Sequence, residues 1–241
     1  MRAPGPENIG QLHSADAMGA EHRDNPLAQY FLRNRERLLW KWHHYFEIYH
    51  RHFQRFRGKS PVVVEVGVFQ GGSLQMWREY FGKGTRIVGI DVDPRCLEFA
   101  DEATTILIGD QADPAFLADV RRRFPHVDIL IDDGGHYMVE QIVTFGELYP
   151  HLQPNGVYLC EDVHTSYLPR WEGGLRRPGT FIEFSKALVD GLHAWYHLPQ
   201  GTEMDEFVLG TYSINFYDSI VVIEKRPIAQ PRVSQTGKLS F

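Results

Sequence analysis

The chain has 241 residues, of which 43% are hydrophobic and 23% are charged, a composition typical of a soluble globular protein. It carries 25 Lys and Arg against 31 Asp and Glu, and the net charge of −6 argues against a protein built to grip nucleic-acid phosphates. No run of 18 apolar residues predicts a membrane span, no apolar segment near Met1 predicts a secretory signal, and two cysteines are too few for a disulfide framework. We therefore expect a cytoplasmic protein with free thiols.

The N-terminal quarter of the chain changes character near residue 26. Residues 1–25 are interrupted by Pro and Gly and predict an irregular segment. Leu27–Phe56 carries apolar residues at helical spacing and predicts one or two amphipathic helices. We expect an N-terminal irregular and helical extension over 1–57, a main domain over 58–226 and a mobile tail over 227–241.

Short β-branched runs then alternate with helical patterns five times. Strands are predicted at Val62–Val66, Arg86–Ile90, Thr104–Ile108, Val127–Ile131 and Val157–Cys160, and helices at Ser73–Phe81, Pro94–Ala100, Asp113–Phe124 and Val139–Tyr149. After a long loop, a helix is expected over Phe181–Tyr196, followed by an antiparallel hairpin of Phe207–Tyr217 and Ile220–Lys225. The order predicts an α/β fold, a doubly wound and mostly parallel seven-stranded sheet with right-handed crossovers.

Glycine and polar residues follow the first three predicted strands. In open α/β sheets, ligands bind beyond the carboxyl ends of the strands. The turn Glu65–Ser73 is rich in glycine, which lets the backbone approach a ligand at a helix N-terminus. Asp91 is placed to bind a ribose diol, and Asp110–Gln111 is placed to hold an adenine amine. Together these positions predict an adenosine-type cofactor.

The pattern E-x-G-x-x-x-G-x-S from Glu65 to Ser73, followed by Asp91, resembles the class I S-adenosylmethionine-dependent methyltransferases. The G-x-G-x-x-G and G-x-x-x-x-G-K-[ST] fingerprints are absent, which argues against an NAD or nucleotide site. The resemblance implies a Rossmann-like methyltransferase domain with S-adenosylmethionine as cofactor. The positions assigned to cofactor binding are Glu65, Gly67, Phe69, Gly71, Ser73, Asp91, Asp110, Gln111 and Asp132.

Carboxylates follow the fourth and fifth predicted strands. The fourth ends in Asp132-Asp133-Gly134-Gly135-His136 and the fifth in Glu161-Asp162. If the two strands are neighbours, the carboxylates converge, and without a Lys or Arg between them they repel one another. A hard divalent cation removes this repulsion, and ligation by oxygen alone suits Mg²⁺.

These two motifs resemble the metal-dependent sugar O-methyltransferases of antibiotic biosynthesis, the macrocin, mycinamicin and rhamnosyl types, a family also described as cephalosporin hydroxylase-like. The resemblance covers about residues 60–170. It implies that Asp133, Glu161 and Asp162 bind Mg²⁺ and that His136 is the general base. Gly135 stands where the sugar family commonly has Ser.

The implied reaction is methyl transfer to a hydroxyl of a sugar or glycosylated natural product. Two vicinal hydroxyls of the acceptor chelate Mg²⁺, His136 takes a proton, and the oxygen attacks the sulfonium methyl in line. His164, Tyr167 and Trp171, in an aromatic loop after the fifth strand, are expected to contact the acceptor. We expect a homo-oligomer that binds neither nucleic acid nor membrane.

Three other functions stay open. The catechol O-methyltransferases share the glycine motif but have Lys at the position of His136, so a catechol-like or other diol acceptor is an alternative. An iron-dependent hydroxylase would use Asp133, His136 and His164, but it leaves the cofactor motif without a role. A non-catalytic adenosine-binding module would not need the carboxylates or His136. Methylation of nucleic-acid bases is disfavoured, because Asp-Asp-Gly-Gly-His stands where such enzymes carry an N-P-P-Y type motif.

Overall fold

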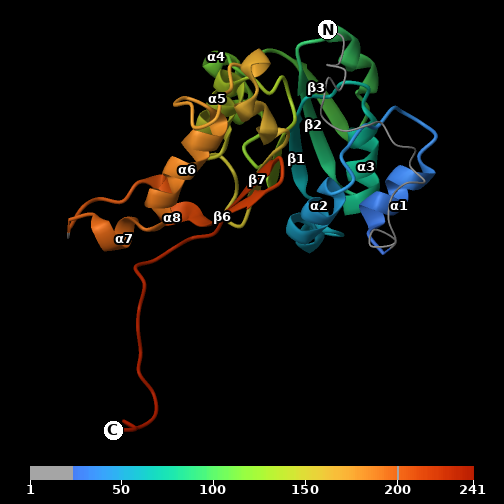
Figure 1. Ribbon diagram of the computed structural model, residues 1–241. Coiled ribbons are helices and arrows are strands. Elements are labelled where there is room, and N and C mark those ends of the chain that lie inside the picture. The colour runs from blue at the N-terminus through green and yellow to red at the C-terminus, as the bar shows by residue number, and fades with distance from the viewer. Residues whose placement is uncertain (1–23, 200) are drawn as a thin grey trace.

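The computed structural model describes residues 24–199 and 201–241, so the expectation for the first 23 residues lies outside the described residues. A seven-stranded sheet of order β3-β2-β1-β4-β5-β7-β6 runs through the molecule (Figure 1). The first five strands are parallel, whereas β7 is antiparallel to both β5 and β6. This confirms the predicted doubly wound sheet with an antiparallel hairpin. The strands are β1 (Val62–Val66), β2 (Arg86–Asp91), β3 (Thr104–Ile108), β4 (Ile129–Asp132), β5 (Val157–Cys160), β6 (Thr211–Tyr217) and β7 (Ile220–Lys225).

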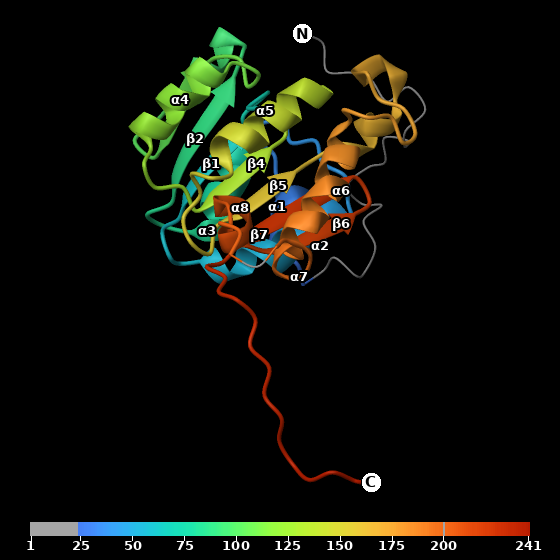
Figure 2. The same cartoon turned by 90° about the vertical axis from the view of Figure 1, so that its left-hand side faces the viewer.

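Helices cover both faces of the sheet (Figures 1 and 2). On one face lie α1 (Pro26–Arg33), α2 (Tyr45–Phe53) and α3 (Gly72–Phe81), and on the other lie α4 (Pro114–Arg123), α5 (Met138–Leu148) and α6 (Phe181–Leu192). Because both faces are covered, the central strands are apolar on both sides: Val63 belongs to the first core cluster and Val64 to the second. Short elements complete the chain: α7 (Ala194–His197), α8 (Glu206–Gly210) and the 3-10 helices η3 (Gln54–Phe56), η4 (Pro94–Phe99), η5 (Val163–Tyr167) and η6 (Pro169–Trp171).

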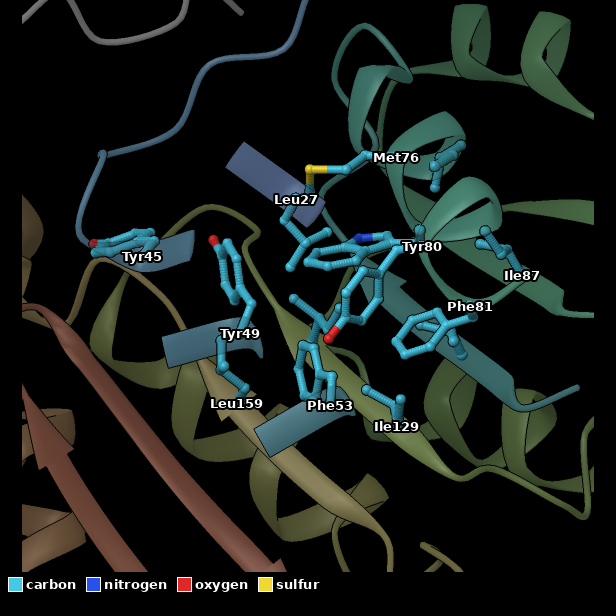
Figure 3. Close-up of a cluster of buried hydrophobic side chains, with 14 of the residues drawn as sticks. Leu27, Tyr45, Tyr49, Phe53, Met76, Tyr80, Phe81, Ile87, Ile129 and Leu159 are labelled. Carbon is cyan, nitrogen blue, oxygen red and sulfur yellow. The ribbon is translucent and has the colours of Figure 1, made fainter. Parts of the chain in front are cut away.

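The core on the α1–α3 face is unusually aromatic (Figure 3). The fully buried Trp77 of α3 lies edge-on to Tyr49 and Phe53 of α2, with ring centroids 5.2 Å and 5.8 Å away. Asn25 caps α1 and also donates a hydrogen bond to the carbonyl of Phe46, 2.7 Å away. The two N-terminal helices therefore share one core with the sheet. This packing holds the segment between α1 and α2 over the carboxyl edge of the sheet.

That segment is not helical. The helical spacing predicted one or two helices over 27–56, and the structure has two that are separated by residues 34–44. Asn34 ends α1: its side-chain oxygen accepts from the amide of Glu36, and its side-chain nitrogen donates to the carbonyl of Arg37. Such Asx turns compete with helical hydrogen bonds.

The prediction of a strand over Phe207–Tyr217 is wrong for its first four residues. Residues 206–210 form α8, because Asp205 accepts from the amide of Val208 and caps a helical turn before β6 begins. Elsewhere the expected helix over Phe181–Tyr196 is divided at His193 into α6 and α7. Residues 226–241 contain no helix or strand. The amides of Arg226 and Ile228 still donate to the carbonyls of Gly210 and Leu209, and the chain beyond them extends away from the body of the molecule (Figure 1). Within the described part of the chain, no helix has the length and apolar character needed to cross a membrane.

Candidate active site

The register of the sheet brings the predicted site residues to one edge. Val66 of β1 pairs with Ile90 on one side and with Asp132 on the other, and Asp132 pairs with Cys160. The residues that follow these four, Gly67, Asp91, Asp133 and Glu161, therefore lie at the same level; Asp91 is the last residue of β2, and the other three leave the sheet there. This is the edge at which ligands of open α/β sheets bind.

The loop after β1 is held in a shape that requires glycine. Gly67 has a φ of +92°, and a Cβ atom there would lie 1.9 Å from the carbonyl oxygen of Asp133. Gly71 has a φ of +69°, and a Cβ atom there would meet the ring of Phe99 at 2.9 Å. Phe69, between them, also has a positive φ of +51° and is exposed. The loop thus brings its backbone close to the acidic end of β4, just before α3 begins.

Asp91 organises this loop in the structure. Its Oδ2 atom accepts from the amides of Val68 and Phe69, 2.9 Å and 3.0 Å away, and its Oδ1 atom accepts from the amide of Asp93 at 2.9 Å. The carboxylate is therefore already anchored at the position where the sequence predicts contact with a ribose.

Glu65 and Ser73 lie together below the loop. The fully buried Glu65 carboxylate accepts from the Ser73 hydroxyl at 3.0 Å and from the Trp77 indole nitrogen at 3.0 Å. Burial raises the pKa of Glu65 to about 7. Both oxygens of Glu65 are hydrogen-bonded to side chains of α3, so Glu65 links β1 to this helix.

Gln111 and Asp132 form a second buried bracket. The Gln111 side-chain nitrogen donates to Asp132 Oδ1 at 3.0 Å, and the Gln111 side-chain oxygen Oε1 accepts from the backbone amide of Gly135 at 3.0 Å. Tyr158 donates to the other oxygen of Asp132, and burial raises the pKa of this carboxyl to about 7. Asp132 is fully buried, so the structure does not bring its side chain to the surface of the site, whereas Asp110 is exposed.

The other acidic residues gather around His136. One ligand atom from each of Asp133, His136 and Asp162 lies within 4.8 Å of the others, and all three residues are half-buried. His136 Nε2 is 3.8 Å from Asp133 and 3.5 Å from Asp162. Both His136 and Asp162 have positive φ values, +63° and +53°, a conformation that costs L residues about 1–3 kcal/mol and clusters at functional sites.

Lys41 lies between two of the carboxylates. The motifs predict carboxylates that converge without a Lys or Arg between them, and this prediction is wrong: the Lys41 ammonium pairs with Asp133 and, at 2.7 Å, with Glu161. Burial by itself would lower the pKa of Lys41, but Asp133 and Glu161 outweigh it and raise that pKa. Burial and repulsion from Asp133 in turn raise the pKa of Glu161 well above its ordinary value. The single positive charge of Lys41 therefore does not balance the carboxylates that surround it.

The residues present fit a divalent cation. Glu161 Oε1 and His136 Nδ1 are buried and have no hydrogen-bond partner among the described residues. Buried polar atoms without a hydrogen-bond partner are rare, and they commonly mark a place where an ion or a water binds. Asp133, Glu161 and Asp162 supply only carboxylate oxygens, which are the ligands that Mg²⁺ prefers.

Asp162 is supported from the side opposite His136. The Tyr45 hydroxyl donates to Asp162 Oδ1 at 2.6 Å and lies 2.8 Å from the Ser219 hydroxyl. Burial alone would raise the pKa of Asp162, but the neighbouring His136 and the hydrogen bond from Tyr45 lower it. The carboxylate is thus held ionised and in a fixed orientation.

The three predicted acceptor contacts are placed differently from one another. His164 is hydrogen-bonded to Ser219 through Nδ1 and lies 3.9 Å from Asp162, so it borders the acidic cluster. Tyr167 is exposed, and Trp171 packs partly against the core on the α4–α6 face. His164 is therefore the one of the three that contacts the cluster.

Lys41, Tyr45 and Ser219 also line the site, although the sequence did not predict them there. Lys41 comes from the segment before α2, Tyr45 from the start of α2 and Ser219 from the β6–β7 turn, so none belongs to the motifs that follow the parallel strands. Lys41 carries one local signal: it stands between Trp40 and Trp42, in an aromatic stretch where a buried lysine needs a partner.

Comparison with known proteins gives relatives of one kind, although no protein-family model matches the sequence. The 8-demethyl-8-alpha-L-rhamnosyl tetracenomycin-C 2'-O-methyltransferase of Streptomyces olivaceus is 36% identical over 196 residues, which cover 78% of this chain and 51% of the relative. The demethylmacrocin O-methyltransferase of Streptomyces fradiae is 34% identical over 204 residues, 77% of this chain and 50% of the relative. The chain thus spans about half the length of the curated relatives it matches.

A solved structure agrees with these relatives. The MycE methyltransferase from the mycinamycin biosynthetic pathway, in complex with Mg and SAH, superposes with a TM-score of 0.73 at 28% identity, over 84% of this chain and 54% of that one. The sheet topology and this similarity define a class I methyltransferase fold. Within that class, the curated proteins similar to this chain are sugar O-methyltransferases of the macrocin, mycinamicin and rhamnosyl types, the types that its motifs resemble.

Proposed function

We propose that this protein transfers a methyl group from S-adenosylmethionine to a hydroxyl of a sugar or glycosylated natural product in a Mg²⁺-dependent reaction. The observation that carries the proposal is the acidic cluster of Asp133, His136 and Asp162, which lies at the carboxyl edge of the sheet directly beside the Gly67 loop. A site for a charged adenosine cofactor and a site for a cation would thus share one edge.

The relatives support the chemistry and the acceptor class. Their names state O-methylation of a rhamnosyl tetracenomycin and of demethylmacrocin, and the MycE structures hold Mg and SAH, one of them together with mycinamycin VI. Since this chain covers about half of each, we extend only the reaction class and the glycoside class of acceptor to it.

The residues have separate roles in this proposal. Asp133, Glu161 and Asp162 would hold Mg²⁺, which when bound acidifies and orients two vicinal hydroxyls of the acceptor. His136 takes the proton from the reacting hydroxyl. Thr165 donates to the His136 carbonyl at 3.1 Å, which helps to keep the strained backbone of this residue in place. The cofactor would lie against the glycine loop, with Asp91 near its ribose, and His164 would border the acceptor.

Metal dependence tests the proposal first. Calorimetry should detect binding of S-adenosylhomocysteine even in excess chelator, because the loop after β1 and the carboxylates are separate. Methyl transfer to a panel of glycosides should disappear in chelator and return with Mg²⁺. Asp133→Asn should abolish turnover, whereas the matched surface change Asp119→Asn on α4 should not. Full turnover in chelator would refute the metal role. Product formation with iron and oxygen instead of Mg²⁺ would favour a hydroxylase, and activity on catechols alone would favour a diol acceptor without a sugar.

The role of His136 has its own test. His136→Ala should lower kcat by about 10²–10⁴ and leave affinity for S-adenosylhomocysteine nearly unchanged. The wild-type rate should rise with pH through one ionisation, since only the neutral imidazole accepts a proton, and this limb should be lost in the variant. A variant with near-normal kcat and the same limb would withdraw the base assignment and leave the metal assignment in place.

We also propose that the protein works in the cytoplasm as a homo-oligomer that binds neither nucleic acid nor membrane. Light scattering on purified full-length protein tests the oligomeric state, and a monomer at working concentrations would contradict it.

A further inference from the structure

Lys41 contacts two of the proposed metal ligands, and the proposed reaction gives it no role. Its side chain is 4% exposed, and its ammonium is bonded to Asp133 Oδ2 and to Glu161 Oε2. The ammonium also lies 6.0 Å from the centre of the Tyr49 ring. A lysine buried this deeply keeps its charge only if anions stay beside it.

The segment that carries Lys41 is firmly seated. The carbonyl oxygen of Leu38 lies so close to Gly72 that a Cβ atom there would be 2.3 Å away, and His44 is hydrogen-bonded to the carbonyl of Asp218. The segment is therefore fixed at the start of α3 on one side and at the β6–β7 turn on the other. These two contacts hold Lys41 beside the carboxylates, so its position does not depend on a freely moving loop.

The charges of the site explain what the ammonium does. Asp133, Glu161 and Asp162 bring three carboxylates to one edge, and among the described lysines and arginines Lys41 is the one that pairs with two of them. Without it, the half-buried Asp133 and the buried Glu161 would face each other without this ammonium, which is unfavourable. With it, these two carboxylates are paired in the metal-free protein, and a divalent ion would be the second cation at this edge.

Asp133 takes part both in the ion pair with Lys41 and in the group of possible metal ligands. It pairs with Lys41, and it also belongs to the group of ligand atoms with His136 and Asp162. A divalent ion held by Asp133 would repel the nearby ammonium, since both are positive. Metal and lysine therefore compete for the same carboxylate.

We propose that Lys41 is a built-in counter-ion of the metal site: it holds Asp133 and Glu161 in place in the metal-free protein and loosens its contact with Asp133 when a divalent ion binds. This inference rests on the proposed metal site. It makes Lys41 a positioning residue that sets metal affinity, and it differs from a simple structural ion pair because its loss has opposite effects on the metal-free and the metal-bound protein.

The test uses the full chain and three variants. Lys41→Met keeps most of the side-chain volume and removes the charge, and Lys41→Arg keeps the charge. Lys225→Met is the matched control, because the Lys225 side chain is also buried, at 8% exposed. Lys225 donates to the carbonyl of Pro150 and lies at the end of β7 away from the β6–β7 turn and the acidic residues. Calorimetry would measure Mn²⁺ and Mg²⁺ affinity without cofactor, and thermal melts would be recorded in chelator and in saturating Mn²⁺.

Lys41→Met should lower the Tm in chelator, bind Mn²⁺ at least tenfold more tightly than the wild type, and recover most of its Tm in saturating Mn²⁺. Lys41→Arg should stay close to the wild type in affinity, and Lys225→Met should lose Tm equally in both conditions with unchanged affinity. If Lys41→Met does not fold in chelator, Lys41→Met combined with Glu161→Gln should, because the second change removes the stranded charge. Failure of the double variant to recover Tm would mean that Lys41 contributes packing alone.

The outcomes separate this inference from the proposed function. Binding of Mn²⁺ to the wild type, with equal or weaker binding to Lys41→Met, overturns the counter-ion and leaves the metal site standing. Binding to Lys41→Met but not to the wild type supports competition in its strongest form. No binding to either protein overturns the metal part of the proposed function together with the inference.

Discussion

The contact between Gly67 and the end of β4 gives a prediction that is independent of any ligand. Gly67→Ala introduces a Cβ atom at a φ of +92°, 1.9 Å from the carbonyl oxygen of Asp133. The positive φ alone costs an alanine about 1–2 kcal/mol. The clash adds to this cost, because contacts under 3.0 Å do not occur and the two strand ends must separate by about 1 Å. We expect a total loss of about 4 kcal/mol of unfolding free energy.

Gly58→Ala separates the two contributions. Gly58 also has a positive φ, +71°, but no atom lies within 4 Å of the position of its Cβ, so this variant should lose only about 1–2 kcal/mol. Urea denaturation followed by tryptophan fluorescence would measure both variants against the wild type. If the losses of Gly67→Ala and Gly58→Ala agree within about 0.5 kcal/mol, the close approach of the loop to Asp133 carries no energetic weight and the reasoning is refuted.

Three further predictions concern single side chains. Asp91→Ala should weaken binding of S-adenosylhomocysteine about 10–100-fold in calorimetry, because it removes charged hydrogen bonds that hold the glycine loop; unchanged affinity would contradict this. Glu224→Gln tests a pH effect: the hydrogen bond from His52 lowers the pKa of Glu224 from 4.5 to about 2, so the carboxylate stabilises the fold above pH 4.5 and this stability is lost as the pH falls towards 2. The gap in unfolding free energy between wild type and variant should be about 2 kcal/mol at pH 7 and close at low pH, whereas a gap that does not depend on pH would point to packing. Trp77→Phe should cost about 2–4 kcal/mol in the same measurement, since it removes the indole donor from the buried Glu65, and a loss below about 1 kcal/mol would show that water replaces it.

The succession of strands and helices along the chain, and the edge of the sheet at which polar residues gather, could be predicted from the sequence. Runs such as Val62–Val66 have an apolar pattern suited to burial on both faces, and each strand is followed at once by the residues that leave the sheet. Because parallel strands all end at one edge, Gly67, Asp133 and Glu161 could be placed together without coordinates. The spacing of apolar residues and the identity of the residues that follow a strand are local properties, and such properties can be read from a sequence.

The other side chains at that edge come from distant parts of the chain, and their positions depend on how those parts pack in the folded protein. Lys41 lies 92 residues from Asp133 and 120 from Glu161 in the sequence, and it reaches them only because α1 and α2 pack against α3 in one aromatic core. The same packing brings Tyr45 to Asp162. Nothing in the local pattern around Lys41 specifies its partner, since an ion pair between distant segments is set by how helices dock and not by spacing. The carboxylates alone indicated a cation site, but only the folded chain shows that the protein supplies one of the positive charges itself.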